Sequence, residues 1–174
     1  MSAPPKGAGG KREPGGGKTP PVRLGSAQVG RGLAAAAAGW LVPGLGHWVV
    51  GARRKALIFF AVVTATITTG FALHGNLSIV DPRTPFISRL QVATNLAMGP
   101  IEPVMRAALY GSLAYRGDEA FVPGPHRQAL ERRRARSFST WSSFGSTYLL
   151  TAGLLNILLL LDAWDIAIGR KPKD

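Results

Sequence analysis

Three long windows without a charged side chain constrain this chain more than any other feature. Residues 32–52, 56–80 and 138–161 contain no Asp, Glu, Lys or Arg, although the 174-residue chain has a net charge of +12. A helix needs about 20 mostly apolar residues to cross a bilayer. These windows predict an all-α integral membrane protein with several passes, and a buried helix in a soluble all-α protein is the alternative.

The expected fold is a helical membrane bundle over residues 32–168, located in the plasma membrane or bacterial inner membrane. The stretches "ALIFFAVVTATITTGFAL" and "YLLTAGLLNILLLL" lack Pro and are rich in Leu, Ile, Phe and Val. These side chains are favourable at the centres of inserted helices. Four hydrophobic segments are therefore predicted, at about residues 32–52, 56–76, 88–115 and 145–168.

The flanking regions are basic. Residues 1–31 mix Gly, Pro, Lys and Arg and carry a net charge of +5. Such a composition buries too little apolar surface to offset the entropy of ordering, so a disordered arm is predicted. Residues 116–140, which include "RRRAR", are predicted to form a basic connecting region with a helix starting near Pro125, and residues 169–174 a short tail. Binding of nucleic acid by these basic segments is considered but not favoured.

A Pro-Gly-x-Gly step interrupts the first hydrophobic segment. Pro43 has no amide hydrogen to donate, so the helix should end or kink there, after about 15 Å. Two geometries follow: a kinked full crossing, or a re-entrant hairpin shielded by neighbouring helices. The basic residues that open the next segment are a topology signal or a contact for anionic lipid headgroups, and they are Arg53, Arg54 and Lys55.

The third segment is amphipathic rather than uniformly apolar. Four polar residues fall at spacings of 4, 7 and 4, which aligns them on one face of a helix kinked by prolines: Gln91, Asn95, Glu102 and Arg106. The simplest prediction is a salt bridge between Glu102 and Arg106. The alternative is a polar stripe that lines a cavity or an ion path, and the segment either crosses the membrane or lies flat on it.

Polar residues in the other segments suggest packing rather than reactions. Asp162 and Asp165 lie near a helix C-terminus, where the macrodipole disfavours carboxylates, so they should pair with cations. Asn156 is expected to hydrogen-bond to a neighbouring helix. His47 follows the break and is expected to pack and hydrogen-bond in a turn, with contact to a headgroup phosphate as the alternative.

Nothing in the sequence assembles a catalytic, metal or cofactor site. The absence of Cys excludes disulfides, thiolate metal sites and Cys nucleophiles. No nucleophile, base and orienting group can be grouped by spacing. The predicted function is therefore non-enzymatic association with anionic lipids, a membrane-protein partner or a second copy of the chain. The alternative is a conduit or ligand-binding protein that uses the polar stripe.

The distribution of basic residues leaves three topologies open. If the first segment is re-entrant and the other three cross, the arm, residues 53–55 and "RRRAR" share the cytoplasmic side. If all four cross, residues 53–55 and "RRRAR" lie outside. If the amphipathic segment lies flat and the other three cross, residues 53–55 lie outside with Asp162 and Asp165 and are available to pair with them.

Two blocks of the sequence resemble known families. The block "PGLGHWVVGARRKALIFF" resembles the signature of the two-transmembrane-helix domain family and its bacterial relatives, through Pro43, Gly44, Gly46, His47 and Gly51. The block "AGLLNILLLLDAWDIAIGRK" resembles the end of an uncharacterised bacterial family of small multi-pass membrane proteins. These resemblances imply a multi-pass membrane fold and no established activity.

Overall fold

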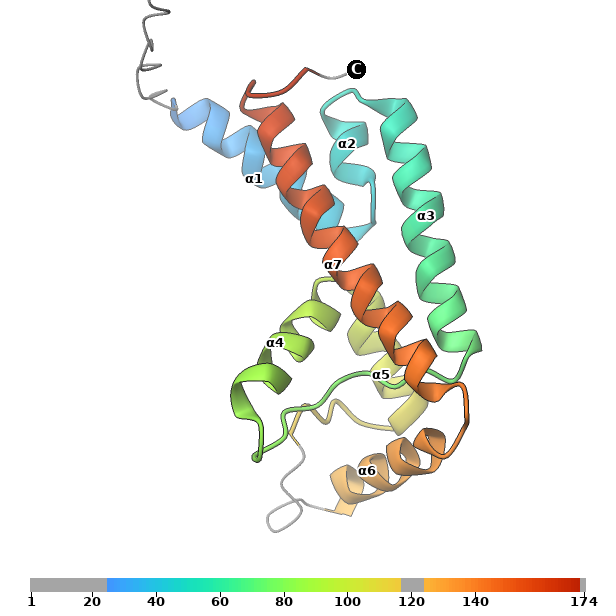
Figure 1. The fold of residues 1–174 in the computed structure, drawn as a ribbon. Coiled ribbons are helices and arrows are strands. Elements are labelled where there is room, and N and C mark those ends of the chain that lie inside the picture. The colour runs from blue at the N-terminus through green and yellow to red at the C-terminus, as the bar shows by residue number, and fades with distance from the viewer. Residues whose placement is uncertain (1–24, 117–123, 173–174) are drawn as a thin grey trace, which may run out of the picture.

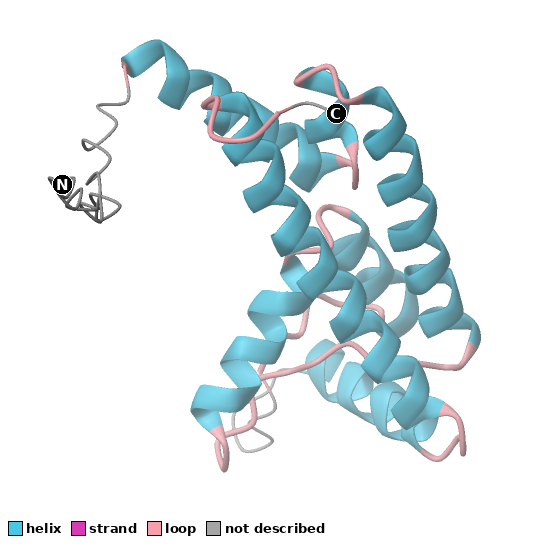
Figure 2. Ribbon diagram, turned by 45° about the horizontal axis from the view of Figure 1, so that its top comes forward, coloured by secondary structure: helices cyan, strands magenta, loops and turns pink. Residues whose placement is uncertain are grey.

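The structure is a computed structural model that describes residues 25–116 and 124–172, and in these ranges it is all-helical without a named strand. Figure 2 shows helices joined by loops and turns of different lengths. In chain order, as labelled in Figure 1, they are α1 (Ser26–Leu41), α2 (Leu45–Val49), α3 (Arg53–Ala72), α4 (Pro85–Leu96), α5 (Ile101–Tyr110), α6 (Gly124–Ser137) and α7 (Ser142–Ala167).

Two long helices, α3 and α7, form the frame of the molecule. They lie side by side and run in opposite directions, as Figure 1 shows. In the described part of the chain, these are the two helices that are long and apolar enough to cross a membrane. Four hydrophobic segments were predicted, but the other two are each divided into two shorter helices.

The first segment forms a helical hairpin. Helix α1 ends at Leu41, and after a short turn α2 runs back alongside it to the end of the molecule where α1 began (Figure 1). Gly44 is left-handed in this turn, with φ of 84°. A Cβ there would lie 2.5 Å from the carbonyl oxygen of Ala56, so the turn is packed directly on α3. The predicted break at Pro43 is thus a reversal of direction.

The third segment forms a second hairpin instead of the single kinked helix expected over residues 88–115. Helix α4 ends at Leu96, and α5 begins at Ile101 and runs back toward the opposite end of the molecule from α2. Gly99 has φ of 83° and Pro100 follows it, a combination that ends a helix and prevents its continuation. The expected continuous polar face is therefore broken between Asn95 and Glu102.

The two hairpins meet at their tips beside the middle of α7. The indole Nε1 of Trp40 donates a hydrogen bond to the carbonyl of Leu96 at 3.0 Å. A Cβ on Gly99 would lie 2.0 Å from the carbonyl oxygen of Trp40, so only glycine fits. Asn156 Nδ2 donates to the carbonyl of Ala97 at 2.7 Å and lies 3.5 Å from that of Gly39. A single α7 side chain therefore contacts both tips.

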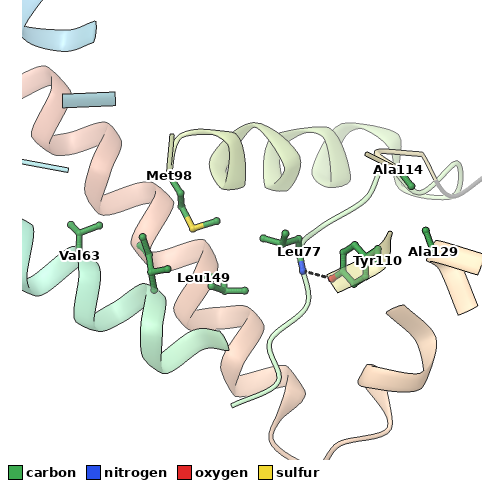
Figure 3. Close-up of a cluster of buried hydrophobic side chains, with 9 residues drawn as sticks. Val63, Leu77, Met98, Tyr110, Ala114, Ala129 and Leu149 are labelled. Carbon is green, nitrogen blue, oxygen red and sulfur yellow. Dashed lines mark hydrogen bonds between the residues drawn. The ribbon is translucent and has the colours of Figure 1, made fainter. Parts of the chain in front are cut away.

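The hydrophobic core lies where the second hairpin meets the two long helices. Figure 3 shows Val63 of α3, Leu149 of α7 and Tyr110 of α5 around this cluster, which also includes Leu77, Met98 and Ala129. The backbone N–H of Leu77 donates to the Tyr110 hydroxyl at 2.9 Å. The core thus fixes α5 and α6 against the α3–α7 frame.

One predicted boundary is corrected. Helix α1 begins at Ser26, so residues 26–31 are helical rather than part of a disordered arm. The Gln28 side chain accepts a hydrogen bond from the backbone N–H of Gly25 at 3.1 Å, which caps this helix. Residues 1–24 lie outside the described residues. The connecting region 116–140 contains α6, and Pro125 lies in its first turn as expected.

The two ends of the molecule are called the terminal end and the α6 end. The terminal end comprises the start of α1, the turn between α2 and α3, and the C-terminal tail, at the top of Figure 1. The α6 end comprises the loop of residues 73–84, α6 and the turn before α7, at the bottom.

Candidate functional site

A fully buried ion pair lies in the second hairpin. The Glu102 and Arg106 side chains on α5 have no exposed surface and sit at the predicted i, i+4 spacing. Arg106 Nε donates to Glu102 Oε1 at 2.7 Å. The other guanidinium nitrogens donate to the carbonyls of Ala114 and Ser78, both at 2.8 Å. The cation is thereby neutralised, and each of its three nitrogens donates a hydrogen bond.

Tyr115 completes this cluster. Its hydroxyl donates to Glu102 Oε2 at 2.9 Å, and the Arg106 guanidinium carbon lies 4.2 Å from the centre of its ring. Burial of the phenol, together with the hydrogen bond to Glu102, raises the pKa of Tyr115. The Glu102–Arg106–Tyr115 cluster holds the end of α5 to the loops beside it, and its charged groups are occupied by bonds within the protein.

Asn76 organises a second polar junction that the sequence did not reveal. Its Nδ2 donates to Ser137 Oγ at 2.9 Å and to Ser142 Oγ at 3.3 Å, and its Oδ1 accepts from the Tyr110 hydroxyl at 3.2 Å. These contacts join the loop after α3 to α5, α6 and α7. Asn76 occurs in a polar loop segment, and no spacing pattern distinguishes it from a solvent-exposed residue.

At the terminal end, His47 and Asp162 form a second charged cluster. The buried His47 donates from Nε2 to Asp162 Oδ2 at 3.0 Å, and its ring lies edge-on to Phe59. Lys171 Nζ donates to the other Asp162 oxygen at 2.6 Å, which raises the pKa of Lys171. His47 thus hydrogen-bonds as expected, but it lies within helix α2 rather than in a turn, and Asp162 pairs with a residue of the tail.

Asp165 lies outside the His47–Asp162–Lys171 cluster. Its carboxylate is 3.8 Å from Arg170, a loose surface contact. The two aspartates therefore contact His47, Lys171 and Arg170 rather than the basic run at residues 53–55. Arg53 of that run lies over the Trp48 ring at 5.7 Å, while Arg54 is exposed and Lys55 is half-buried.

The glycines of the opening motif have structural roles. Gly44 and Gly51 both adopt positive φ at the two ends of α2, at 84° and 90°. A Cβ on Gly46 would lie 2.5 Å from the carbonyl oxygen of Ala35, so Gly46 permits α2 to touch α1. The motif Pro-Gly-x-Gly-His therefore specifies a compact hairpin and its hydrogen bond to Asp162.

Two fully buried asparagines, Asn95 and Asn156, lie close to the junction of the hairpin tips. Asn156 bonds to the second hairpin through its nitrogen, but its buried Oδ1 has no partner among the described residues. Asn95 of α4 is fully buried, and neither of its side-chain polar atoms has a partner there. A Cβ on Gly153 would lie 1.9 Å from the carbonyl oxygen of Thr94, so α4 and α7 are in backbone contact here.

The proposed polar stripe therefore contains three environments. Asn95 is buried at the hairpin junction, while Glu102 and Arg106 lie in the Glu102–Arg106–Tyr115 cluster. Gln91 is half-buried and lines a pocket beside α6. Among the described residues, no three His, Asp or Glu side chains gather in a group that could hold a metal ion.

Comparison with known proteins gives a family but no activity. A family model described as a family of unknown function (DUF6677) matches residues 34–172, from α1 to the tail. No curated protein and no solved structure matches the chain significantly. The resemblance to the two-transmembrane-helix domain family stays a prediction.

Proposed function

We propose that this chain, which belongs to the family of unknown function DUF6677, is a non-enzymatic integral membrane protein that associates with anionic lipids or a membrane-protein partner. Helices α3 and α7 would cross the bilayer. The two hairpins would enter it from opposite faces and meet near its midplane. A 20-residue helix such as α3 is about 30 Å long, which matches the hydrocarbon thickness.

The observation that carries the proposal is the inverted polarity of the fold. Only 22% of the apolar window of α3 and 28% of that of α7 are buried within the protein, whereas the core helix of a soluble protein is mostly buried. Side chains such as Leu57, Ile58 and Leu158 are exposed on these helices. Glu102 and Arg106 are at the same time fully enclosed. Lipid is the solvent that suits such a surface.

The hairpins also meet the requirements of a bilayer. Their tips expose apolar side chains at Leu41, Val42 and Leu96. The backbone at the two turns, which cannot be left unpaired in lipid, is packed against neighbouring helices at Gly44 and Gly99. This placement differs from all three topologies expected from the sequence, because both the first and the amphipathic segments would be re-entrant.

Charge favours the terminal end as the cytoplasmic one. Residues 1–55 contain nine basic residues and one acidic residue, whereas residues 73–141 contain nine basic and five acidic residues. The positive-inside rule thus places both termini in the cytoplasm and α6 on the opposite side. Arg53, Arg54 and Lys55 would then lie at the level of the headgroups of the inner leaflet, where anionic lipids are attracted.

Cysteine accessibility tests this placement directly, because the natural chain has no Cys. Single substitutions at exposed positions, Arg54→Cys, Pro82→Cys, Arg127→Cys and Arg170→Cys, are labelled with a membrane-impermeant maleimide in intact cells and in opened vesicles. We expect positions 82 and 127 to react from outside and positions 54 and 170 only after opening. Labelling of 82 and 127 from opposite sides would overturn the two-hairpin topology, and extraction of the chain by alkaline carbonate would overturn membrane insertion.

The conduit alternative has less support. It needs Glu102 and Arg106 to contact a passing ligand, but both side chains are fully buried and their polar atoms already bond to Tyr115, Ser78 and Ala114. Opening that cluster would leave buried charges unpaired, which costs several kcal/mol. Association is therefore the function that the geometry favours.

A further inference from the structure

An arginine-lined pocket at the α6 end is not used by any contact described so far. It has a volume of about 600 Å³, within the usual range for small-ligand sites, and lies between the loop of residues 79–84, α4 and α6. Figure 1 shows α4 at the left of the molecule and α6 at the bottom. The residues that line it are Ile79, Asp81, Pro82, Arg83, Thr84, Ser88, Gln91, Leu130, Arg133 and Arg134.

We propose that this pocket binds a phosphate group, carried either by a lipid headgroup or by a water-soluble phosphate ester. Arg83 enters from the loop and Arg133 and Arg134 from α6, so cations from two separate elements face one space. Guanidinium groups match phosphate oxygens with paired N–H donors and are the preferred side chains for this recognition.

Arg133 is the strongest reason to expect an anion. Its Nε is anchored by a hydrogen bond to the carbonyl of Leu77 at 3.1 Å, so the guanidinium has a fixed orientation. Burial of this group and the nearby charge of Arg106 lower the pKa of Arg133. No carboxylate in the described part of the chain forms an ion pair with it. A partly buried cation without a counter-ion is unfavourable, and a bound anion removes that cost.

The remaining lining suits a phosphate ester better than a free carboxylate or an apolar ligand. Thr84 and Gln91 can add neutral donors beside the arginines. Asp81 is occupied locally, because its Oδ1 accepts the backbone N–H of Arg83 at 2.8 Å. Ile79 and Leu130 provide a small apolar wall for the carbon atoms next to the phosphate.

Binding of a lipid headgroup in this pocket rests on the proposed membrane function, whereas binding of a soluble phosphate ester does not. In the proposed topology the pocket lies at the bilayer surface opposite the arm, so it is separate from the basic run at residues 53–55. A headgroup could enter it laterally, and a soluble ester could enter it from water. The two sources are distinguished by the probe.

The test uses the full chain in nanodiscs of zwitterionic lipid, with thermal unfolding as the readout. One titration adds glycerol 3-phosphate, and the other incorporates increasing phosphatidylglycerol. We expect a saturable rise in the unfolding temperature with at least one probe. Arg83→Gln and Arg133→Gln should each weaken the apparent affinity about tenfold or more, as expected for a lost charged hydrogen bond.

Two variants control for general basicity. Arg127→Gln removes an exposed charge from α6, and Arg89→Gln removes one from α4, and neither residue lines the pocket. Both should bind like the natural chain. A response to the soluble ester supports a soluble ligand, and a response to the lipid alone supports a headgroup site. No saturable response to either probe, or equal weakening in all four variants, would overturn the proposal.

Failure here is distinguishable from failure of the proposed function. A chain that shows the expected cysteine labelling but no saturable response keeps its membrane topology and loses the phosphate site. Because Arg133 also bonds to Leu77, the unfolding temperature of Arg133→Gln without ligand is compared with that of the natural chain. Arg83 makes no such core contact, so Arg83→Gln keeps the test valid if Arg133→Gln unfolds early.

Discussion

The two hairpins both reverse the direction of the chain, but different interactions stabilise them. Each is a pair of short helices that reverses direction near the middle of α7. The α1–α2 hairpin is held by close backbone contact, with Gly46 against Ala35, and by the partly exposed His47–Asp162 pair. In the α4–α5 hairpin, the fully buried Glu102–Arg106 pair fastens α5 to the loops at Ser78 and Ala114. The first therefore depends on the absence of side chains and the second on complete pairing of charges.

Breaking the buried pair should have the largest effect. Glu102→Gln leaves the Arg106 cation enclosed without its counter-ion, and we expect the free energy of unfolding to fall by about 3–5 kcal/mol. Denaturation in detergent, followed by the loss of helical circular dichroism, measures this. The double variant Glu102→Gln/Arg106→Gln removes both charges and should recover part of the loss. If the single variant is as stable as the natural chain, the pair does not hold the second hairpin.

Adding one methyl group to the first hairpin should have the next largest effect. In Gly46→Ala the new Cβ would lie 2.5 Å from the carbonyl oxygen of Ala35 and 3.1 Å from Ala163. Helices α1 and α2 must then separate, at a cost of about 1–3 kcal/mol in the same denaturation measurement. Gly30→Ala is the matched control, since a Cβ there meets nothing within 4 Å. Equal effects of the two changes would show that close packing is not what fastens α1.

Asp162→Asn should cost less, about 1 kcal/mol in the free energy of unfolding. It removes the charge that His47 and Lys171 share but keeps an oxygen that can accept a hydrogen bond. Asp165→Asn serves as the comparison, because Asp165 makes only the 3.8 Å surface contact to Arg170 and should change almost nothing. A larger loss of unfolding free energy in Asp165→Asn than in Asp162→Asn would contradict this order.

The smallest effect concerns pH at the terminal end. The hydrogen bond to Asp162 raises the pKa of Lys171 above 10.5. A raised pKa in the folded state means that this contribution to stability is complete below pH 10.5 and disappears as the pH rises through the folded value. Unfolding measured across this range should show a small decline that high salt and Lys171→Met both remove. A decline that persists in Lys171→Met would assign it to another group, such as Tyr115, whose pKa is also raised.

Local patterns predicted the parts of this fold that depend on neighbouring residues in the chain. The break at Pro43-Gly44 follows from the missing amide and the left-handed glycine, and the Glu102–Arg106 pair follows from helical spacing. The same spacing misled at Gly99, because a continuous polar face favoured one helix while Gly-Pro, a typical helix end, indicated a turn.

The longer-range contacts could not have been predicted in the same way. His47 and Asp162 are 115 positions apart, and no periodicity connects them. The pocket at Arg83 and Arg133 likewise joins a loop to a helix that follows much later in the chain. The run "RRRAR" indicated only a charged surface, since a sequence does not show which of several arginines is half-buried beside a pocket.

The contact between the hairpin tips has a consequence for biogenesis. The α1–α2 hairpin leaves the ribosome first, yet the groups that hold its tip, the carbonyl of Leu96 and the amide of Asn156, are synthesised much later. Until α7 emerges, the early hairpin lacks these partners. Of the described helices, α1 and α2 are therefore synthesised first but gain these contacts late. A nascent chain that stalls before α7 leaves the α1–α2 hairpin without its contact to Asn156.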